Sequence, residues 1–321
     1  MKTFIKNLLK FLLTLTVIIL AIHFTTGSII NRKANFKVAS HPKYIVVGHS
    51  HPECALNDSL ITNFKNLSDS GESYLYTYFK LKKIIEKNKS IKTVFLAFTN
   101  NEINSTIDDW TWDSMNISER YTKLSPFMDV QSNCILLKNN PSGFLNSFSY
   151  SNKDKIGQIL HSEYDYSRRI GGYLYLVRDK IDSLIAALPK DKIIKRSNPK
   201  VSKINLKYLA KIIENCHQQG IKLFLIRCPI HPKCPGLFNE KEYKAIYKAR
   251  FSSVELLDFK DFPLQNTDFG DLEHLNYKGA KKFSIWFEKL MTDGLLEKAD
   301  KQKYINEKII EESKVPISPL G

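Results

Sequence analysis

The segment Lys43-Tyr-Ile-Val-Val-Gly-His-Ser-His51 decides the fold, because a short apolar run ends at a glycine and polar residues follow at once. This pattern is typical of a buried strand that ends in a tight turn. The turn would carry Ser50, with His49 and His51 on either side of it, to the end of the strand. We therefore expect a sheet with reactive side chains at its strand ends.

Further apolar runs of strand length alternate with segments of helical periodicity. The predicted strands after the first are residues 64–68, 93–98, 222–227 and 254–258, and the predicted helices are residues 73–88, 205–219, 239–250 and 278–291. Alternating strands and helices need crossover connections, so they predict an α/β fold with a parallel sheet between layers of helices. In such sheets ligands bind beyond the carboxyl ends of the strands.

The N-terminal segment is basic and then apolar. Lys2, Lys6 and Lys10 accompany an apolar run over residues 8–24, which has about the minimum length of a spanning helix. We predict a single transmembrane signal anchor at 8–24, with residues 1–7 in the cytoplasm and the rest on the periplasmic side of the cytoplasmic membrane. The alternative is a cleaved signal peptide and a secreted or periplasmic protein, although Ala21-Ile22-His23 breaks the usual cleavage pattern.

The remaining chain divides by composition. We predict a polar linker over residues 25–42, an α/β domain over 43–298 and a charged C-terminal tail over 299–321. Residues 105–200 interrupt the domain as an aromatic, polar insertion of helices and loops. Its Trp110 and Trp112 either stack on sugar rings or pack the insertion onto the core.

The net charge and the cysteines argue against two kinds of site, one for nucleic acid and one for a metal ion. The formal net charge of +15 comes from scattered lysines, whereas a nucleic-acid site concentrates basic residues with aromatic residues between them. We therefore expect no nucleic-acid partner, and the sequence indicates no particular protein partner. Cys228 and Cys234 lie close enough in sequence for a loop disulfide, which stays open as an alternative to free thiols. No second ligand pair accompanies them, so no metal site is expected there.

Two sequence elements carry the chemistry. Ser50 stands at a strand end, where its hydroxyl can face the ligand crevice. Far along the chain, Asp271 precedes His274 by three residues just before the last long helix, so the carboxylate can orient the imidazole as a base. A turn or cap residue is the alternative for Ser50 and Asp271, and a surface side chain is the alternative for His274.

These residues resemble the SGNH (GDSL-like) hydrolases over roughly residues 43–290. The resemblance rests on Ser50 after the first strand, Gly71 in Asp-Ser-Gly-Glu, and the element Asp271-x-x-His274-Leu-Asn-x-x-Gly-Ala. It implies a flavodoxin-like fold, with a parallel sheet sandwiched by helices. Two departures stand out: the family's Gly-Asp-Ser is Gly-His-Ser here, and its Gly-x-Asn-Asp block is Thr99-Asn-Asn-Glu102.

The resemblance implies a serine esterase or O-acyltransferase that acts on an ester, such as an O-acetyl group, of a bacterial cell-envelope polysaccharide or glycoconjugate. Ser50 is the expected nucleophile, with the Asp271–His274 pair as its base, and no cofactor is implied. The oxyanion hole would comprise the N–H groups of Ser50 and Gly71 and the amide of Asn101, or of Asn100.

Other roles remain open for the site and for the whole chain. His49 and His51 are expected to line the pocket mouth rather than to hold a metal together with Cys54. The alternative function is a non-catalytic SGNH-fold protein that binds polysaccharide or scaffolds an envelope assembly.

Overall fold

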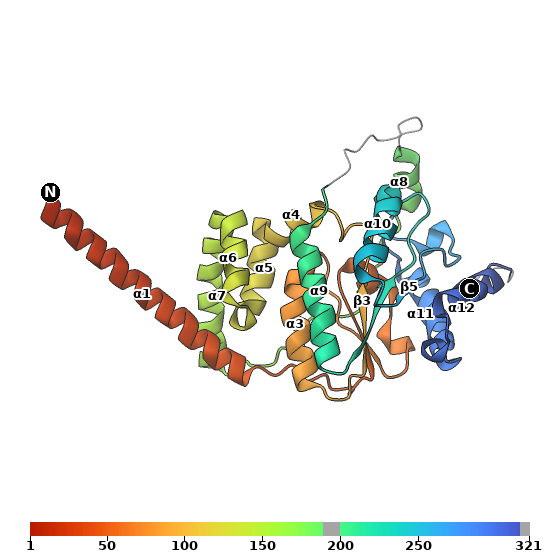
Figure 1. The fold of residues 1–321 in the computed structure, drawn as a ribbon, viewed down its shortest axis with the longest axis horizontal. Coiled ribbons are helices and arrows are strands. Elements are labelled where there is room, and N and C mark those ends of the chain that lie inside the picture. The colour runs from red at the N-terminus through yellow and green to blue at the C-terminus, as the bar shows by residue number, and fades with distance from the viewer. Residues whose placement is uncertain (189–199, 315–321) are drawn as a thin grey trace. The chain divides into compact units, whose positions relative to one another are not determined.

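The structure is a computed structural model that describes residues 1–188 and 200–314. Its chain forms two compact units (Figure 1). Unit 1 combines Met1–Lys37 with Thr111–Arg169, and unit 2 combines Val38–Trp110 with Ile170–Gly321. Parts of the predicted insertion (189–199) and of the predicted tail (315–321) lie outside the described residues.

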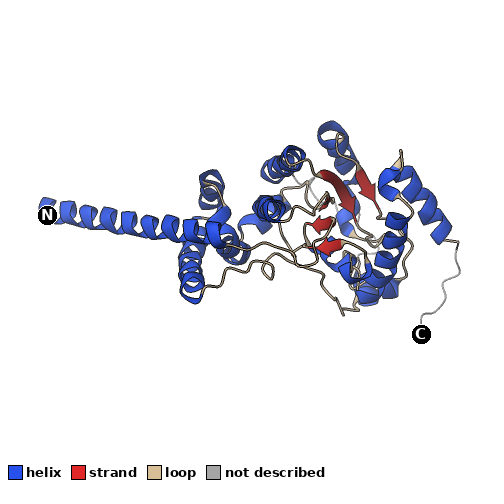
Figure 2. Ribbon diagram, turned by 90° about the horizontal axis from the view of Figure 1, so that it is seen from below, coloured by secondary structure: helices blue, strands red, loops and turns tan. Residues whose placement is uncertain are grey.

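A five-stranded parallel sheet organises unit 2 (Figure 2). Its strands are β1 (Tyr44–Val47), β2 (Phe64–Asn66), β3 (Thr93–Ala97), β4 (Lys222–Arg227) and β5 (Leu256–Asp258), in the order β2-β1-β3-β4-β5. Every neighbouring pair is parallel. The predicted α/β fold with a parallel sheet is thus confirmed, and each of the five predicted strands is present.

Both faces of the sheet are buried, as the near-continuous apolar strands require. Val46, Phe95 and Phe224 are successive partners across β1, β3 and β4, so their side chains share one face. They pack in one hydrophobic cluster with Phe283 and Phe287 of the last long helix. The alternate strand residues face the helices on the other side.

The helices of unit 2 come from all parts of its sequence. They are α2 (Ser50–Ala55), η1 (Asp58–Leu60), α3 (Tyr74–Lys87), α8 (Ile181–Ala187), α9 (Lys203–Gln218), η3 (Pro235–Asn239), α10 (Glu240–Ile246), η4 (Tyr247–Phe251), η5 (Asn266–Asp268), α11 (Tyr277–Thr292), η6 (Leu295–Glu297) and α12 (Lys301–Glu312). Helix α3 packs on α9, and α11 packs on α2. Helix α12 lies beyond the predicted domain limit at residue 298, yet its Ile305 is fully buried in the same cluster as the strands.

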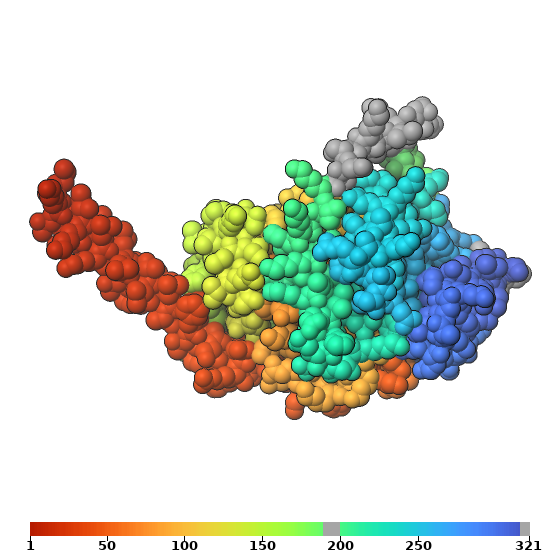
Figure 3. Space-filling view, viewed as in Figure 1, coloured from red at the N-terminus to blue at the C-terminus, as the bar shows by residue number. Residues whose placement is uncertain are grey.

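Unit 1 is helical. Its elements are α1 (Lys2–Lys33), α5 (Ser114–Leu124), η2 (Ser125–Phe127), α6 (Val130–Asn139) and α7 (Pro141–His161), and the boundary between the units falls within α4 (Thr106–Trp112). Helix α1 is long and apolar enough to cross a membrane. Its side chains are exposed as far as residue 22 (Figure 3). The helix therefore extends well past the predicted span and into the predicted linker.

The C-terminal part of α1 is built into unit 1. His23, Gly27 and Ile30 are its buried residues. His23 Nδ1 lies 2.8 Å from Asn152 Oδ1 and 2.9 Å from the Nζ of the fully buried Lys155, both on α7. Several side chains of α1 from His23 onward therefore pack within unit 1, whereas the side chains of residues 1–22 are exposed.

Candidate functional site

The turn after β1 is shaped by a glycine. Gly48 has a φ of +143°, and a Cβ placed on it would lie 2.3 Å from Ala97 Cβ on the neighbouring strand β3. A larger residue would therefore push the two strands apart. Ser50 is the first residue of α2, and the cap is His49, whose Nδ1 accepts the N–H of His51 at 3.4 Å. The Ser50 hydroxyl is thus not used for capping.

The loop before α11 holds the other half of the site. Asn276 caps α11 by accepting the N–H groups of Lys278 and Gly279. Asp271 Oδ1 accepts the backbone N–H groups of Glu273 at 2.8 Å and His274 at 2.9 Å. These bonds fix the backbone between Asp271 and His274, so both side chains are held in place before any ligand arrives.

The fold brings Ser50, His274 and Asp271 together, although 224 positions separate Ser50 from His274. His274 Nε2 lies 2.7 Å from Ser50 Oγ. On the other side of the ring, His274 Nδ1 lies 2.8 Å and 3.0 Å from the two oxygens of Asp271. A carboxylate at Nδ1 favours the tautomer that leaves Nε2 free to accept a proton. This geometry would allow His274 to accept the Ser50 proton while Asp271 orients the ring.

Asp271 is held in its charged form. Burial alone would raise the pKa of its carboxyl, but hydrogen bonds from His274 and from the backbone outweigh burial and hold that pKa well below its usual range. Arg178 adds an ion pair to the same carboxylate. A fixed negative charge therefore faces His274 at physiological pH.

Gly71 lies beside the turn that carries Ser50. It has a left-handed φ of +66°. The Asp69 N–H donates to Gly48 O at 2.9 Å, and the Ser70 hydroxyl donates to Glu53 on α2. These two bonds tie the turn that carries Gly71 to the turn that carries Ser50.

A cavity of about 230 Å³ joins the predicted residues. Its lining includes seven residues that the sequence analysis singled out: His49, Ser50, His51, Gly71, Asn101, Trp110 and His274. Trp110 is exposed, with 55% of its surface accessible, so it is free to contact a ligand. Trp112 belongs to unit 1 and is not among the residues that line this cavity.

The two candidate asparagines occupy different places. Asn100 is buried and engaged, since its amide donates to Glu240 and its oxygen accepts from Arg227 at 3.0 Å. Arg227 in turn pairs with Glu240 and Asp258. Asn101 instead lines the cavity with Ser50. Its position fits an oxyanion donor, and that role stays a prediction.

A buried polar cluster of His49, Glu102 and Tyr74 adjoins the turn that carries Ser50. Burial raises the pKa of Glu102 to about 8 and lowers that of His49. The two side chains are 3.7 Å apart, yet these shifts favour their neutral forms over an ion pair. The Tyr74 hydroxyl oxygen lies 2.6 Å from Ala97 O and 2.8 Å from Glu102 Oε2. One phenol proton cannot serve both oxygens, which agrees with a protonated Glu102.

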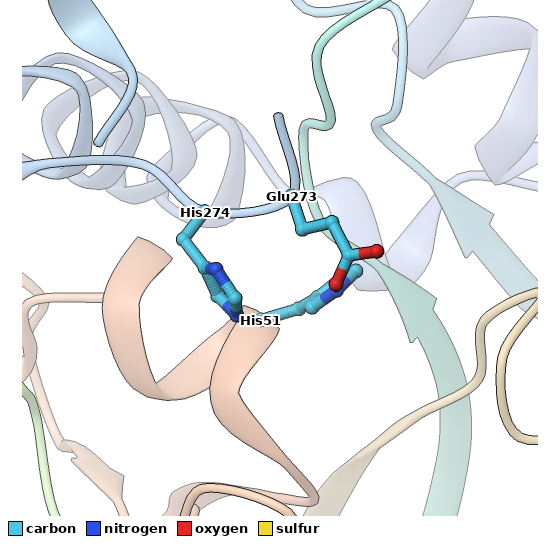
Figure 4. A group of neighbouring side chains, drawn as sticks. All are labelled: His51, Glu273 and His274. Carbon is cyan, nitrogen blue, oxygen red and sulfur yellow. The ribbon is translucent and has the colours of Figure 1, made fainter. Parts of the chain in front are cut away.

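Glu273 is a cavity residue that the sequence analysis missed. Its Oε2 lies 4.0 Å from Nε2 of the buried His51, and Figure 4 shows these two side chains directed toward each other, beside His274. Contact with His51 lowers the pKa of the Glu273 carboxyl and outweighs desolvation. Its place between Asp271 and His274 in the motif was the available signal. Arg178 was also missed, and nothing in its sequence context marks it.

The cysteines are all free thiols, so Cys228 and Cys234 form no disulfide in this structure. Burial raises the pKa of Cys54 and of Cys234 to about 12. These thiols therefore remain protonated and unreactive at neutral pH.

Fold and site together define an α/β protein that presents a Ser-His-Asp arrangement beyond the carboxyl ends of parallel strands. A family model for a domain of unknown function matches residues 76–296, more than half of the chain. The chain belongs to that family. The matched range includes Asp271 and His274 and begins after Ser50 and Gly71. A search of curated proteins finds no match.

Proposed function

We propose that this protein is a serine esterase or O-acyltransferase of the SGNH type. The observation that carries the proposal is the 2.7 Å contact between Ser50 Oγ and His274 Nε2, with Asp271 on the far side of the imidazole. The strand order supports it, because 2-1-3-4-5 is the order of flavodoxin-like sheets.

The proposed reaction proceeds through an acyl-enzyme. His274 takes the Ser50 proton as Ser50 Oγ attacks the ester carbonyl, and the imidazolium forms beside the Asp271 carboxylate. The N–H groups of Ser50 and Gly71 and the side-chain amide of Asn101 stabilise the oxyanion. The imidazolium then protonates the leaving alcohol. Water or a sugar hydroxyl, deprotonated by His274, then attacks the acyl carbonyl; the bond to Ser50 Oγ breaks, and the imidazolium returns its proton to Ser50.

The proposed substrate is an ester, such as an O-acetyl group, on a cell-envelope polysaccharide or glycoconjugate. The cavity is large enough for a small acyl group, and the exposed Trp110 at its lining offers a flat apolar face to a sugar ring. The protein would reach such a polymer from the membrane, with α1 as an uncleaved anchor. The packing of His23 and Ile30 into unit 1 supports retention of the helix.

Covalent labelling of the full-length protein in detergent tests the proposal. A fluorophosphonate probe should label the wild type once and should not label Ser50→Ala. Ser59→Ala is a matched control, because Ser59 lies outside the cavity in η1. If folded wild type is not labelled, or if Ser50→Ala is labelled equally, the non-catalytic binding protein is the better reading.

The products separate hydrolase from transferase. With an acetyl ester as donor, a hydrolase releases acetate whether or not a polysaccharide is present. A transferase should move the acetyl group onto the polysaccharide and should release less free acetate when the polysaccharide is added.

A further inference from the structure

Three side chains on one wall of the cavity offer metal-binding atoms. One nitrogen each from His51 and His274 and one carboxylate oxygen from Glu273 all lie within 4.8 Å of one another (Figure 4). The rings of His51 and His274 meet edge to face, with centroids 5.3 Å apart. The three atoms come from two elements, α2 and the loop before α11, which the site already holds together.

The donor set is one that zinc accepts. Two imidazoles and one carboxylate, with a fourth position left for water, form a common open zinc site. Nitrogen donors favour Zn²⁺ or Co²⁺ over Mg²⁺ and Ca²⁺.

The surroundings already orient one ligand. Asp271 holds Nδ1 of His274 at 2.8 Å, which leaves Nε2 as the free acceptor. A carboxylate behind a histidine ligand is the usual outer partner of protein-bound zinc. His274 is therefore prepared for a metal ion by the same bond that prepares it as a base.

The required movement is small. Bonds of about 2.0–2.1 Å to a tetrahedral ion place ligand atoms about 3.4 Å apart. His51 Nε2 and Glu273 Oε2 are already 4.0 Å apart, and the Glu273 side chain is 40% exposed. The three atoms thus need to approach by at most about 1.4 Å, the difference between 4.8 Å and this spacing.

We propose that His51, Glu273 and His274 form a site for a divalent zinc-like ion and that the bound ion inhibits the enzyme. The Nε2 lone pair of His274 cannot bind a metal and accept the Ser50 proton at the same time. Metal binding would break the 2.7 Å contact with Ser50 and leave the serine without its base. The inhibitory part of this inference rests on the proposed function, whereas the binding part does not.

Cobalt binding tests the site directly. Full-length protein in detergent, stripped with EDTA, is titrated with Co²⁺ and followed by the visible absorption of the bound ion, and Zn²⁺ is then added as a competitor. We expect one ion per chain. His51→Gln and Glu273→Gln should each raise the dissociation constant at least about tenfold. His217→Gln should leave it unchanged, since His217 is exposed at the end of α9.

Labelling of Ser50 tests the inhibition. Zn²⁺ should slow fluorophosphonate labelling of wild type and His217→Gln in proportion to occupancy, EDTA should restore it, and His51→Gln and Glu273→Gln should need correspondingly more Zn²⁺. Equal cobalt affinity in wild type and both site variants would overturn the metal site. Unchanged labelling at full zinc occupancy would overturn the inhibition. If cobalt binds as expected but metal-free protein is never labelled, the proposed function fails and the metal site stands.

Discussion

Replacement of Asp271 by Asn isolates the charge behind the proposed base. In the structure Asp271 Oδ1 accepts two backbone N–H groups as well as His274 Nδ1. The side-chain oxygen of Asn should take the place of Oδ1, where it can accept the same two backbone N–H groups. The Asn NH₂ group would be repelled there, because it would face two N–H donors. The variant should therefore keep the loop conformation and the imidazole tautomer. It loses the negative charge and also the ion pair with Arg178, because the NH₂ group takes the place of Oδ2.

The size of the effect follows from the geometry. The atom distances of 2.8 Å and 3.0 Å place the charge centres of carboxylate and imidazolium about 4 Å apart. At an effective dielectric constant of about 20, that separation corresponds to about 4 kcal/mol. If the imidazolium forms fully in the transition state, the rate should fall about 10³-fold.

The assay is the rate constant for fluorophosphonate labelling of Ser50, measured in the metal-free protein. Arg178→Gln removes the outer ion pair, whose arginine is 47% exposed, and should cost at most about fivefold. Asp261→Asn is the matched control, because Asp261 is an exposed aspartate paired only with Lys260 among the ion pairs of the described residues. A rate for Asp271→Asn within tenfold of wild type would refute the reasoning.

Three further predictions concern the cavity and the residues behind it. Asn101→Ala should lower kcat about 10²–10³-fold with little change in KM. Asn100→Ala should instead lower the melting temperature, because Asn100 is bonded within the buried Arg227 network. If kinetics and thermal melts show the opposite pattern, Asn100 is the better candidate for the oxyanion donor. Because burial raises the Glu102 pKa to about 8, the stability from its neutral form is complete below its ordinary value of 4.5 and is lost as the pH rises through about 8. The stability advantage of wild type over Glu102→Gln should therefore shrink between these pH values, and a constant difference in pH-dependent melts would contradict a neutral Glu102. Trp110→Ala should raise KM for a polysaccharide substrate without changing kcat for a small acetyl ester, and equal effects on both substrates would argue against sugar stacking.

The local sequence was sufficient for much of the fold. Residues 43–47 and 93–98 read as buried strands because parallel strands covered on both faces are apolar throughout, and the structure has β1 and β3 there. The role of the C-terminus was harder to predict. Half of residues 301–312 are charged, and α12 meets β5 only in the folded chain, where the Ile305 side chain becomes fully buried.

Some residues of the candidate site could likewise be found from local sequence, and others could not. That Ser50 meets the Asp271–His274 pair was predictable because each lies in a short motif with its own spacing. The sequence could not decide between Asn100 and Asn101, because the two residues are adjacent and their side chains point to different places. Asn100 bonds to Arg227, which is far away in the sequence, whereas Asn101 lines the cavity. Glu102 looks like an ordinary surface acid in sequence, and only the fold buries it.

The histidines around Ser50 explain how a Gly-His-Ser-His turn is compatible with the proposed chemistry. His49 and His51 are in contact, with ring centroids 4.5 Å apart, and His51 also meets His274. If either neighbour were charged, it would oppose the positive charge that forms on His274 during catalysis. Burial lowers the pKa of both His49 and His51 and keeps them neutral. In the proposed mechanism the imidazolium therefore faces the Asp271 carboxylate with no positive charge on His49 or His51, and Arg178, on the other oxygen of that carboxylate, is the neighbouring cation.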